Sequence, residues 1–328
     1  MELKIKTLPV SEENYAETMK TKVEPYLAGI RADGHFASFD GKDIHYEKYV
    51  IPNAVGTVVL VHGFTESAEK FREMAYNYLM MDLNAFVIDN RGHGLSYRKH
   101  PENPETVCVD RFEEYVEDLK AFVDKIVKPA VPKDLPLYLY CHSMGGAIGV
   151  QFLQTYPDVF TKAVLSAPMI EPMSKPLNVP ITKAIMRVFC AFGQKDKMVF
   201  IHHGFNPDRG WEDSHDTSKA RFEYYHEKRK ADHNLQTAGA SCAWVREAMK
   251  VVKKNLDPKR NARITLPVLL CQPETDTSVV SEKENVFVGQ LKNARLVQFP
   301  ASKHEIYLSV DSTMLTYLQT IEKFLKED

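Results

Sequence analysis

The sequence predicts an α/β fold, in which helices cover both faces of a mostly parallel central sheet. Short, continuous apolar runs recur along the chain, as expected for strands buried on both faces. Segments with helical hydrophobic spacing separate these runs, which is the alternation that parallel strands require. The alternation fails over residues 171–240, so we expect a helical cap insertion over the sheet there.

The segments before the first central strand predict a helix and a hairpin. Residues 11–30 are interpreted as a polar helix. Residues 35–50 predict two strands joined at Asp40-Gly41, because an Asp-Gly pair favours a tight hairpin turn.

Strands and helices then alternate along the chain. The apolar runs that predict strands are residues 56–61, 85–88, 135–140, 163–165, 267–271 and 296–299. The clearest helix is predicted over 111–128, where apolar residues recur at 3.6-residue spacing. Asp110 and Glu113 resemble a capping box at its start. Further helices are expected over 147–156 and, inside the insertion, over 179–192.

Composition excludes several classes of protein. The chain has 328 residues, 44% apolar and 26% charged, with a net charge of −2, so nothing suggests a nucleic-acid partner. Its five cysteines are widely spaced and form no CxxC pair, which argues against a zinc site or a disulfide scaffold. We therefore expect reduced thiols and a cytoplasmic location.

The distribution of apolar residues also bears on membranes and domains. No stretch has the length of a membrane-spanning helix, and no apolar run near the start resembles a signal peptide. Any membrane contact is therefore expected to be peripheral, through the cap. We expect a first part of the core over 1–170, the cap over 171–240 and a second part of the core over 241–328.

A serine at a strand-to-helix turn is the main chemical signal. Residues 140–146, YCHSMGG, follow an apolar strand and open a helix, which is the context of a nucleophile elbow. Such a turn lifts the Ser143 hydroxyl above the sheet edge, where free amides and the helix dipole favour an oxyanion. Cys141 replaces the first glycine of the usual G-x-S-x-G pattern, and we expect the elbow to tolerate this small residue with slight strain.

Two loops after strands predict the surroundings of this serine. Residues 62–67, HGFTES, can supply one oxyanion amide, and the residue after the nucleophile can supply the other, so we assign Phe64 and Met144. His62 is expected to bond backbone groups and to shape the loop. Residues 89–96, DNRGHGLS, are interpreted as structural support for the oxyanion loop.

Serine needs a base, and the base needs an orienting carboxylate. In this type of fold the chain order is serine, acid, histidine. Asp276 follows a late strand and His304 follows the next one, so we predict the set Ser143, Asp276 and His304. Glu274 is the alternative acid, and His233 is the alternative base.

With these residues in place, the chain resembles the α/β-hydrolase superfamily and, within it, the monoacylglycerol lipase and lysophospholipase group. The resemblance rests on HGFTES, DNRGHGLS and CHSMGG, followed by Asp276 and His304. A weaker likeness over residues 218–222 and 244–248 points to the cap of bacterial lysophospholipases. The resemblance implies an α/β-hydrolase fold with a helical cap, and hydrolysis of the remaining acyl ester of a lysophospholipid.

The expected function is therefore cleavage of fatty-acid esters through a Ser-His-Asp acyl-enzyme, most simply as a lysophospholipase. The expected partner is a small lipid or ester substrate, with no metal and no organic cofactor, and no pattern indicates an oligomeric state. The alternatives are a monoacylglycerol lipase or broad carboxylesterase, an aminopeptidase of the same fold, and a non-catalytic binding protein. An aminopeptidase would need a cap carboxylate for the substrate amine, and the candidates are Glu223, Glu227 and Asp232.

Apolar and basic residues of the cap bear on the substrate. The helix over 179–192 carries one apolar face, formed by Ile181, Ile185, Val188, Phe189 and Phe192. This face either binds lipid, as a wall for an acyl chain or as a surface patch, or simply packs the cap onto the core. The basic residues nearby either meet a phosphate or form a solvated face; they are Lys183, Arg187, Lys195 and Lys197.

Overall fold

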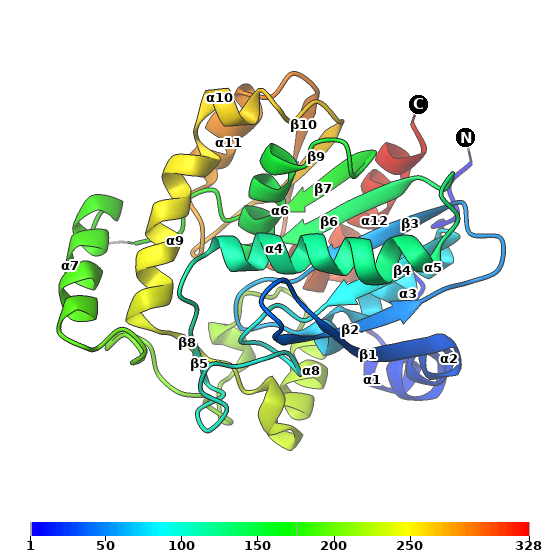
Figure 1. Cartoon of the computed structure of the whole chain (residues 1–328). Helices are drawn as coiled ribbons and strands as arrows, with labels where there is room; N and C mark the ends of the chain where they lie inside the picture. Colours follow the sequence, from blue (N-terminus) through cyan, green and yellow to red (C-terminus); the bar gives the residue numbers. More distant parts are fainter. Residues whose placement is uncertain (1, 175, 328) are drawn as a thin grey trace.

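The computed structural model describes residues 2–174 and 176–327 and confirms the predicted α/β fold (Figure 1). The strands of its main sheet are β1 (Arg31–Ala37), β2 (Asp43–Tyr49), β3 (Gly56–Val61), β4 (Leu83–Ile88), β6 (Leu137–His142), β7 (Lys162–Ser166), β9 (Val268–Pro273) and β10 (Ala294–Phe299). Their spatial order is β1-β2-β4-β3-β6-β7-β9-β10. From β4 to β10 all neighbours are parallel, whereas β2 runs antiparallel to both β1 and β4.

Helices cover both faces of this sheet (Figure 1). The helices in the described residues are α1 (Tyr15–Thr18), α2 (Glu24–Ile30), α3 (Arg72–Met80), α4 (Glu113–Phe122), α5 (Lys128–Ala130), α6 (Met144–Thr155), α7 (Val179–Ala191), α8 (Lys219–Ala231), α9 (Cys242–Asn255), α10 (Pro258–Asn261), α11 (Ser281–Gly289) and α12 (Asp311–Lys326). Within the described residues, π-helical turns over Met19–Val23 and Val123–Val127 join α1 to α2 and α4 to α5.

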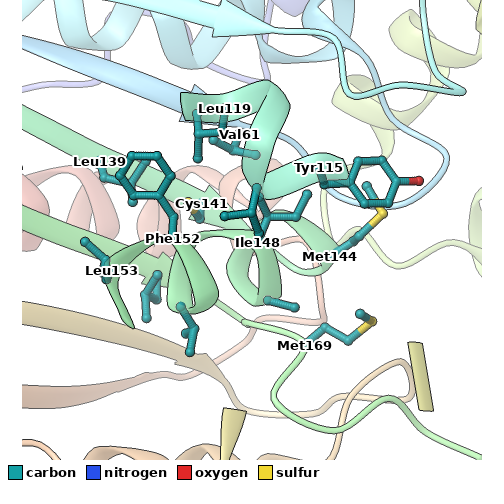
Figure 2. Packing of buried hydrophobic residues seen from close by; sticks show 14 of the residues in the cluster. Val61, Tyr115, Leu119, Leu139, Cys141, Met144, Ile148, Phe152, Leu153 and Met169 are labelled. Atoms are coloured by element: carbon teal, nitrogen blue, oxygen red, sulfur yellow. The ribbon is translucent and has the colours of Figure 1, made fainter. Parts of the chain in front are cut away.

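Because helices cover both faces of the sheet, the strands appear in the sequence as continuous apolar runs. Successive residues of a strand point to opposite faces. Val59 and Val61 therefore join the apolar cluster with residues of α4, α6 and α9, whereas Val58 and Leu60 join the cluster with residues of α3 and α12. Figure 2 shows part of the first cluster, where Val61 and Ile148 pack between the sheet and α6.

Two sequence predictions about helices need correction. The N-terminal helix begins at Tyr15 and is not polar throughout, because Tyr15, Met19, Val23 and Leu27 are buried at four-residue spacing. The predicted capping box is wrong: the cap residue of α4 is Phe112, and no side chain caps that helix. Asp110 instead accepts a hydrogen bond from Lys99 Nζ at 2.8 Å. Its carboxylate therefore binds a residue outside the helix and does not cap it.

The segment that we propose as the cap holds α7, α8 and the short strand β8 (Gly239–Ala240). Strand β8 pairs in parallel with β5 (Thr106–Val107), which ties the end of this segment to the core. Helix α7 lies beside α9, whereas α8 lies lower in the view, apart from α7 (Figure 1). No helix in the described part of the chain is both long and apolar enough to cross a membrane.

A buried carboxyl group in α11 makes the stability of the fold depend on pH. Glu284 is 0% exposed, and its Oε2 accepts a hydrogen bond from Gln272 Nε2 at 2.8 Å. Burial, reinforced by the charge of Asp276, raises the pKa of Glu284 to about 8. The folded chain therefore keeps a proton that the unfolded chain releases above about pH 4.3.

Glu284→Gln is expected to stabilise the fold progressively more, relative to the parent, as pH rises from 5 to 8. Protonated Glu284 contributes its full stability to the parent fold below the pKa that it has in the unfolded chain. That contribution is lost as pH rises through the pKa of Glu284 in the folded chain, which is about 8. Glutamine does not ionise, so the melting temperature of the variant minus that of the parent should be higher at pH 8 than at pH 5, by about 2 °C or more. Scanning calorimetry at both pH values measures this, with Glu282→Gln on the exposed side of α11 as the control. An equal shift at both pH values would contradict the prediction.

Candidate active site

Ser143 lies between β6 and α6 in a strained turn. Its φ is +51°, a conformation that residues other than glycine rarely adopt, and its amide donates to the Ser166 carbonyl at 3.1 Å. A Cβ on Gly145 would lie 2.7 Å from the His62 carbonyl oxygen, so only glycine fits there. The glycine and the strained φ together place the Ser143 hydroxyl at the N-terminus of α6.

Cys141 fits into the elbow because Gly149 leaves room for its sulfur. The Cys141 side chain is fully buried, and a Cβ on Gly149 would lie only 2.6 Å from its Sγ. Its φ is not positive, so the strain in the turn is held by Ser143. Burial raises the pKa of the Cys141 thiol well above its usual value, so the thiol stays protonated and is a poor nucleophile.

The structure brings the three residues of the predicted catalytic set together. Asp276 follows β9 and His304 follows β10, so both reach the edge of the sheet where Ser143 lies. His304 Nε2 is 2.8 Å from Ser143 Oγ, and His304 Nδ1 is 2.7 Å from Asp276 Oδ2. This hydrogen-bonded chain can transfer a proton from the hydroxyl to the imidazole.

The environment of Asp276 keeps its carboxylate charged. Its Oδ1 accepts hydrogen bonds from the amides of Ser278 and Val279, at 2.7 and 2.9 Å. Burial alone would raise the pKa of Asp276, but the hydrogen bond and charge of His304, with these two amides, lower it overall. A carboxylate that stays ionised can stabilise a protonated His304.

The two rival residues lie elsewhere. Glu274 Oε2 accepts a hydrogen bond from the Ala301 amide at 2.7 Å, so it supports the loop that leads to His304. His233 is exposed, and its Nδ1 lies 3.1 Å from Gln236 Oε1. Neither residue lines the cavity that contains Ser143.

The two amides assigned to the oxyanion hole lie beside the nucleophile. Met144 directly follows Ser143 at the start of α6, and Phe64 lines the same cavity. A Cβ on Gly63 would lie 3.0 Å from Ser143 Cβ, so the loop passes close to the serine. Among the described residues, no protein group accepts a hydrogen bond from either amide. Both donors therefore stay available to a ligand.

The two loop motifs hold each other through hydrogen bonds. The Asn90 amide donates to His62 Nε2 at 3.0 Å, and Asn90 Nδ2 donates to the His62 carbonyl at 3.0 Å. His62 Nδ1, which then carries the proton, donates to the Gly63 carbonyl at 2.7 Å. His62 thus shapes the loop before Phe64, in line with its expected role.

A buried ionic cluster beside the serine was missed at the sequence level. Lys70 Nζ lies 3.0 Å from Glu66 Oε1 and 2.7 Å from Glu305 Oε1. Glu66 Oε2 also accepts a hydrogen bond from the Gly63 amide at 2.5 Å, so the cluster fixes the loop next to Ser143. The available signal was the four-residue spacing of Glu66 and Lys70 together with an acidic residue directly after His304.

The histidine before the nucleophile is neutral. Burial, with smaller contributions from nearby cations, lowers the pKa of His142 to about 4. Its ring centre lies 4.9 Å from that of His304. Because His142 carries no charge near pH 7, it does not oppose the formation of a His304 imidazolium.

Ser143 and His304 open into a cavity of about 700 Å³. Its apolar wall comes mainly from α7, α9 and nearby loops, and includes Leu177, Ile185, Met186, Val199, Phe200, Ile201, Trp244, Val245 and Met249. Its polar wall comes mainly from α8 and the preceding loop, and includes Arg209, Ser214, His215, Asp216, Tyr225 and Arg229. A cavity with both an apolar and a charged wall suits an amphipathic ligand.

Several cap residues that the sequence suggested as substrate-binding groups lie outside this cavity. The carboxylates considered for an aminopeptidase do not line it: Glu223 and Glu227 are exposed, and Asp232 is half-buried. The basic residues first considered for a phosphate also do not line it: Lys183, Arg187, Lys195 and Lys197. The cavity therefore takes its free positive charge from other residues.

Two clusters of potential metal ligands occur in the described residues. One consists of Glu66, His142 and Glu305, but both of its carboxylates already pair with the Lys70 ammonium. The other consists of His100, Cys108 and Asp196, where Lys99 Nζ lies 3.0 Å from Asp196 Oδ1. All five cysteines are free thiols, as expected.

Comparisons with known proteins identify the family of the chain. Residues 52–311 match the family described as serine aminopeptidase, S33. A probable lysophospholipase L2 from Haemophilus influenzae is 25% identical over 82% of this chain and 83% of its own length. Lysophospholipase L2 from Escherichia coli is 34% identical over 42% of this chain and 40% of its own length. The crystal structure of a soluble monoglyceride lipase variant from Saccharomyces cerevisiae superposes with a TM-score of 0.72 at 20% identity, covering 90% of this chain and 95% of that one.

Proposed function

We propose that this chain, which belongs to the serine aminopeptidase S33 family of α/β-hydrolases and is an ester-hydrolysing enzyme, acts as a lysophospholipase with Ser143 as its nucleophile. The observation that supports the mechanism is the hydrogen-bonded chain from Ser143 through His304 to Asp276 at the base of an amphipathic cavity. Membership of a family named for an aminopeptidase does not decide the substrate, because function depends on the site.

The proposed reaction has two symmetrical halves. His304 takes the Ser143 proton as Oγ attacks the ester carbonyl, and the amides of Phe64 and Met144 stabilise the oxyanion. The alcohol leaves with the proton from His304, and the acyl group stays on Ser143. Water then enters by the same route and releases the fatty acid. Asp276 holds the His304 tautomer and stabilises the imidazolium in both halves.

The two walls of the cavity support a single-chain lipid as the substrate. The apolar wall gives one acyl chain a surface that excludes water. The polar wall suits a hydrated head group on the leaving alcohol. An aminopeptidase is less well supported, because none of the three cap carboxylates considered for it lines the cavity, and Glu66 and Glu305, which do line it, already pair with Lys70.

Release of fatty acid tests the proposal. The enzyme is incubated with lysophosphatidylcholine and with a monoacylglycerol of the same acyl chain, and the free acid is quantified. Faster release from the lysophospholipid would support the assignment. Faster release from the monoacylglycerol would reassign the enzyme as a monoacylglycerol lipase. Release from neither lipid would overturn both.

We also propose that the outer surface of α7 contacts the lipid surface that supplies the substrate. Val188 on this helix and Phe192 directly after it are 54% and 79% exposed, and Phe200 and Ile201 are 73% and 67% exposed. Phe200 and Ile201 also line the cavity of Ser143, and the Phe200 ring stacks on that of Phe189 in α7 with 6.4 Å between ring centres, which links the exposed apolar surface to the cavity. Exposed apolar clusters of this kind commonly mark lipid or protein contacts.

Val188→Glu combined with Phe192→Glu is expected to weaken binding to phosphatidylcholine vesicles by about tenfold or more, because each apolar side chain contributes roughly 1.5 kcal/mol or more when buried. Vesicle co-sedimentation measures the partition. Val55→Glu, at a 55% exposed position before β3, is the control. Equal loss of binding in the control, or no loss in the double variant, would refute the contact.

A further inference from the structure

Two arginines line the active-site cavity without a carboxylate partner. Arg229 Nε donates to the Leu235 carbonyl at 3.0 Å, and its Nη2 donates to the Thr237 carbonyl at 2.7 Å. Arg209 Nη2 donates to the Asp213 carbonyl. Across residues 2–174 and 176–327, no carboxylate forms an ion pair with either guanidinium. Carbonyl oxygens orient the two groups but do not neutralise their charge.

The neighbouring cation in the same cavity is fully compensated. Lys70 contacts two carboxylates, Glu66 and Glu305. Asp216 adds no compensating charge, since burial, together with the adjacent Glu305, raises its pKa well above the usual range and keeps the carboxyl protonated. One ammonium that faces two carboxylates leaves this cluster no positive charge to offer, so the positive groups of the polar wall are Arg209 and Arg229.

The two guanidiniums are close enough to affect each other. Burial lowers the pKa of Arg229, and the charge of Arg209 lowers it further, whereas Tyr225 and the more distant Glu305 and Glu66 act in the opposite direction without forming an ion pair. The face of the Arg229 group rests on the Phe205 ring, with a 4.6 Å separation from the ring centre, so its donors point outward from its edge. Nε and Nη2 already donate to carbonyl oxygens, and Nη1 has no acceptor among the described residues. Partly buried like charges without counterions are costly unless an anion joins them.

The arginine segment is attached to the loop that carries His304. The Glu305 amide donates to the His215 carbonyl at 3.2 Å, and Lys303 Nζ donates to the Ser214 carbonyl at 3.2 Å. Both arginines therefore lie on the polar side of the nucleophile, whereas the apolar wall comes from α7 and α9, which lie side by side away from α8 (Figure 1). An acyl chain on the apolar wall would direct the leaving alcohol towards the arginines.

We propose that Arg209 and Arg229 form an anion subsite that binds the phosphate of the leaving alcohol, so that the enzyme selects glycerophospho esters over uncharged glycerol esters. Two guanidiniums from different segments can each donate to phosphate oxygens, and such charge-assisted bonds are strong and geometrically selective. This subsite rests on the proposed function and adds the chemical class of head group to it.

Kinetics on matched substrates tests the role of the pair in selectivity. Lysophosphatidic acid, lysophosphatidylcholine and monoacylglycerol with one acyl chain are compared by kcat/KM below their aggregation limits. Arg209→Gln and Arg229→Gln are each expected to lower the ratio of lysophospholipid to monoacylglycerol turnover by about tenfold or more, mainly through KM. Lys230→Gln removes an exposed cation one residue from Arg229, outside the cavity, and should leave the ratio unchanged.

The two phosphate sources give different outcomes. A larger loss with lysophosphatidic acid than with lysophosphatidylcholine would assign the subsite to phosphate monoesters, and an equal loss would assign it to phosphate in general. An unchanged ratio in both arginine variants would overturn the subsite. Arg209→Gln is decisive if Arg229→Gln unfolds, because Arg209 has a single backbone acceptor.

A binding measurement separates this inference from the proposed function. Calorimetric titration of the enzyme with sn-glycerol 3-phosphate, at constant ionic strength, requires no turnover. Saturable binding that weakens about tenfold in each arginine variant, and recovers in part in Arg229→Lys, is expected. Absence of binding to the parent, or equal binding by glycerol, would overturn the subsite even if the enzyme hydrolyses lipids. Binding without lipid hydrolysis would overturn the proposed function and leave the subsite standing.

Discussion

Ser143→Ala is expected to lower kcat for ester hydrolysis by about 10⁵-fold or more, by comparison with the loss of the nucleophile in other serine hydrolases. His304 Nε2 lies 2.8 Å from Ser143 Oγ, and alanine leaves this base without a proton to take. The remaining rate should reflect binding and the oxyanion amides alone. Initial rates on a chromogenic short-chain ester measure the loss independently of the lipid substrate.

Two controls make the Ser143 result specific. The melting temperature of Ser143→Ala should match that of the parent within a few degrees, because the strained turn is held by its backbone contacts. Ser312→Ala, on an exposed position of α12, should keep the parent rate. A Ser143→Ala variant that retains more than about a tenth of the activity would exclude Ser143 as the nucleophile.

Asp276→Asn is expected to lower kcat by about 10⁴-fold while preserving the fold, as the corresponding change does in other triad enzymes. The structure supplies the reason in this chain. The Ser278 and Val279 amides donate to Oδ1, so they hold the asparagine carbonyl oxygen at that position. The asparagine NH₂ then faces His304 Nδ1, which must become an acceptor. The proton moves to Nε2, and His304 can no longer act as a base towards Ser143.

Glu274→Gln provides the matched comparison for Asp276→Asn. Glu274 was the alternative acid, but its Oε2 accepts the Ala301 amide, and a glutamine oxygen can do the same. We expect this variant to keep activity within about threefold of the parent, since one neutral hydrogen bond is worth only about 1 kcal/mol. Rates for both variants between pH 6 and 9 measure the difference. A comparable loss in Glu274→Gln would overturn the assignment of the acid.

The parts of the fold that were predicted correctly share one physical property. Each central strand is covered on both faces, so its apolar residues form an unbroken run that is visible without knowledge of its neighbours. The strand of residues 56–61 was predicted with its observed bounds for this reason. The capping box at Asp110 failed because that prediction used local spacing only, while Lys99 binds the carboxylate in the folded chain.

The sequence by itself determined the order of the core strands and helices and the catalytic residue types at the strand ends, because both can be recognised from residues that are close together in the chain. Ser143, Asp276 and His304 were selected by residue type and chain order before any distance was known. The tertiary structure alone decided which polar groups are neutralised. In the sequence, Arg209 and Arg229 are indistinguishable from ordinary basic residues, and only the fold shows that they share a cavity and form no ion pair within the described residues. Only the tertiary structure likewise shows that Gly149 leaves room for the Cys141 side chain. Packing and charge compensation both depend on residues that are distant in sequence and adjacent in space.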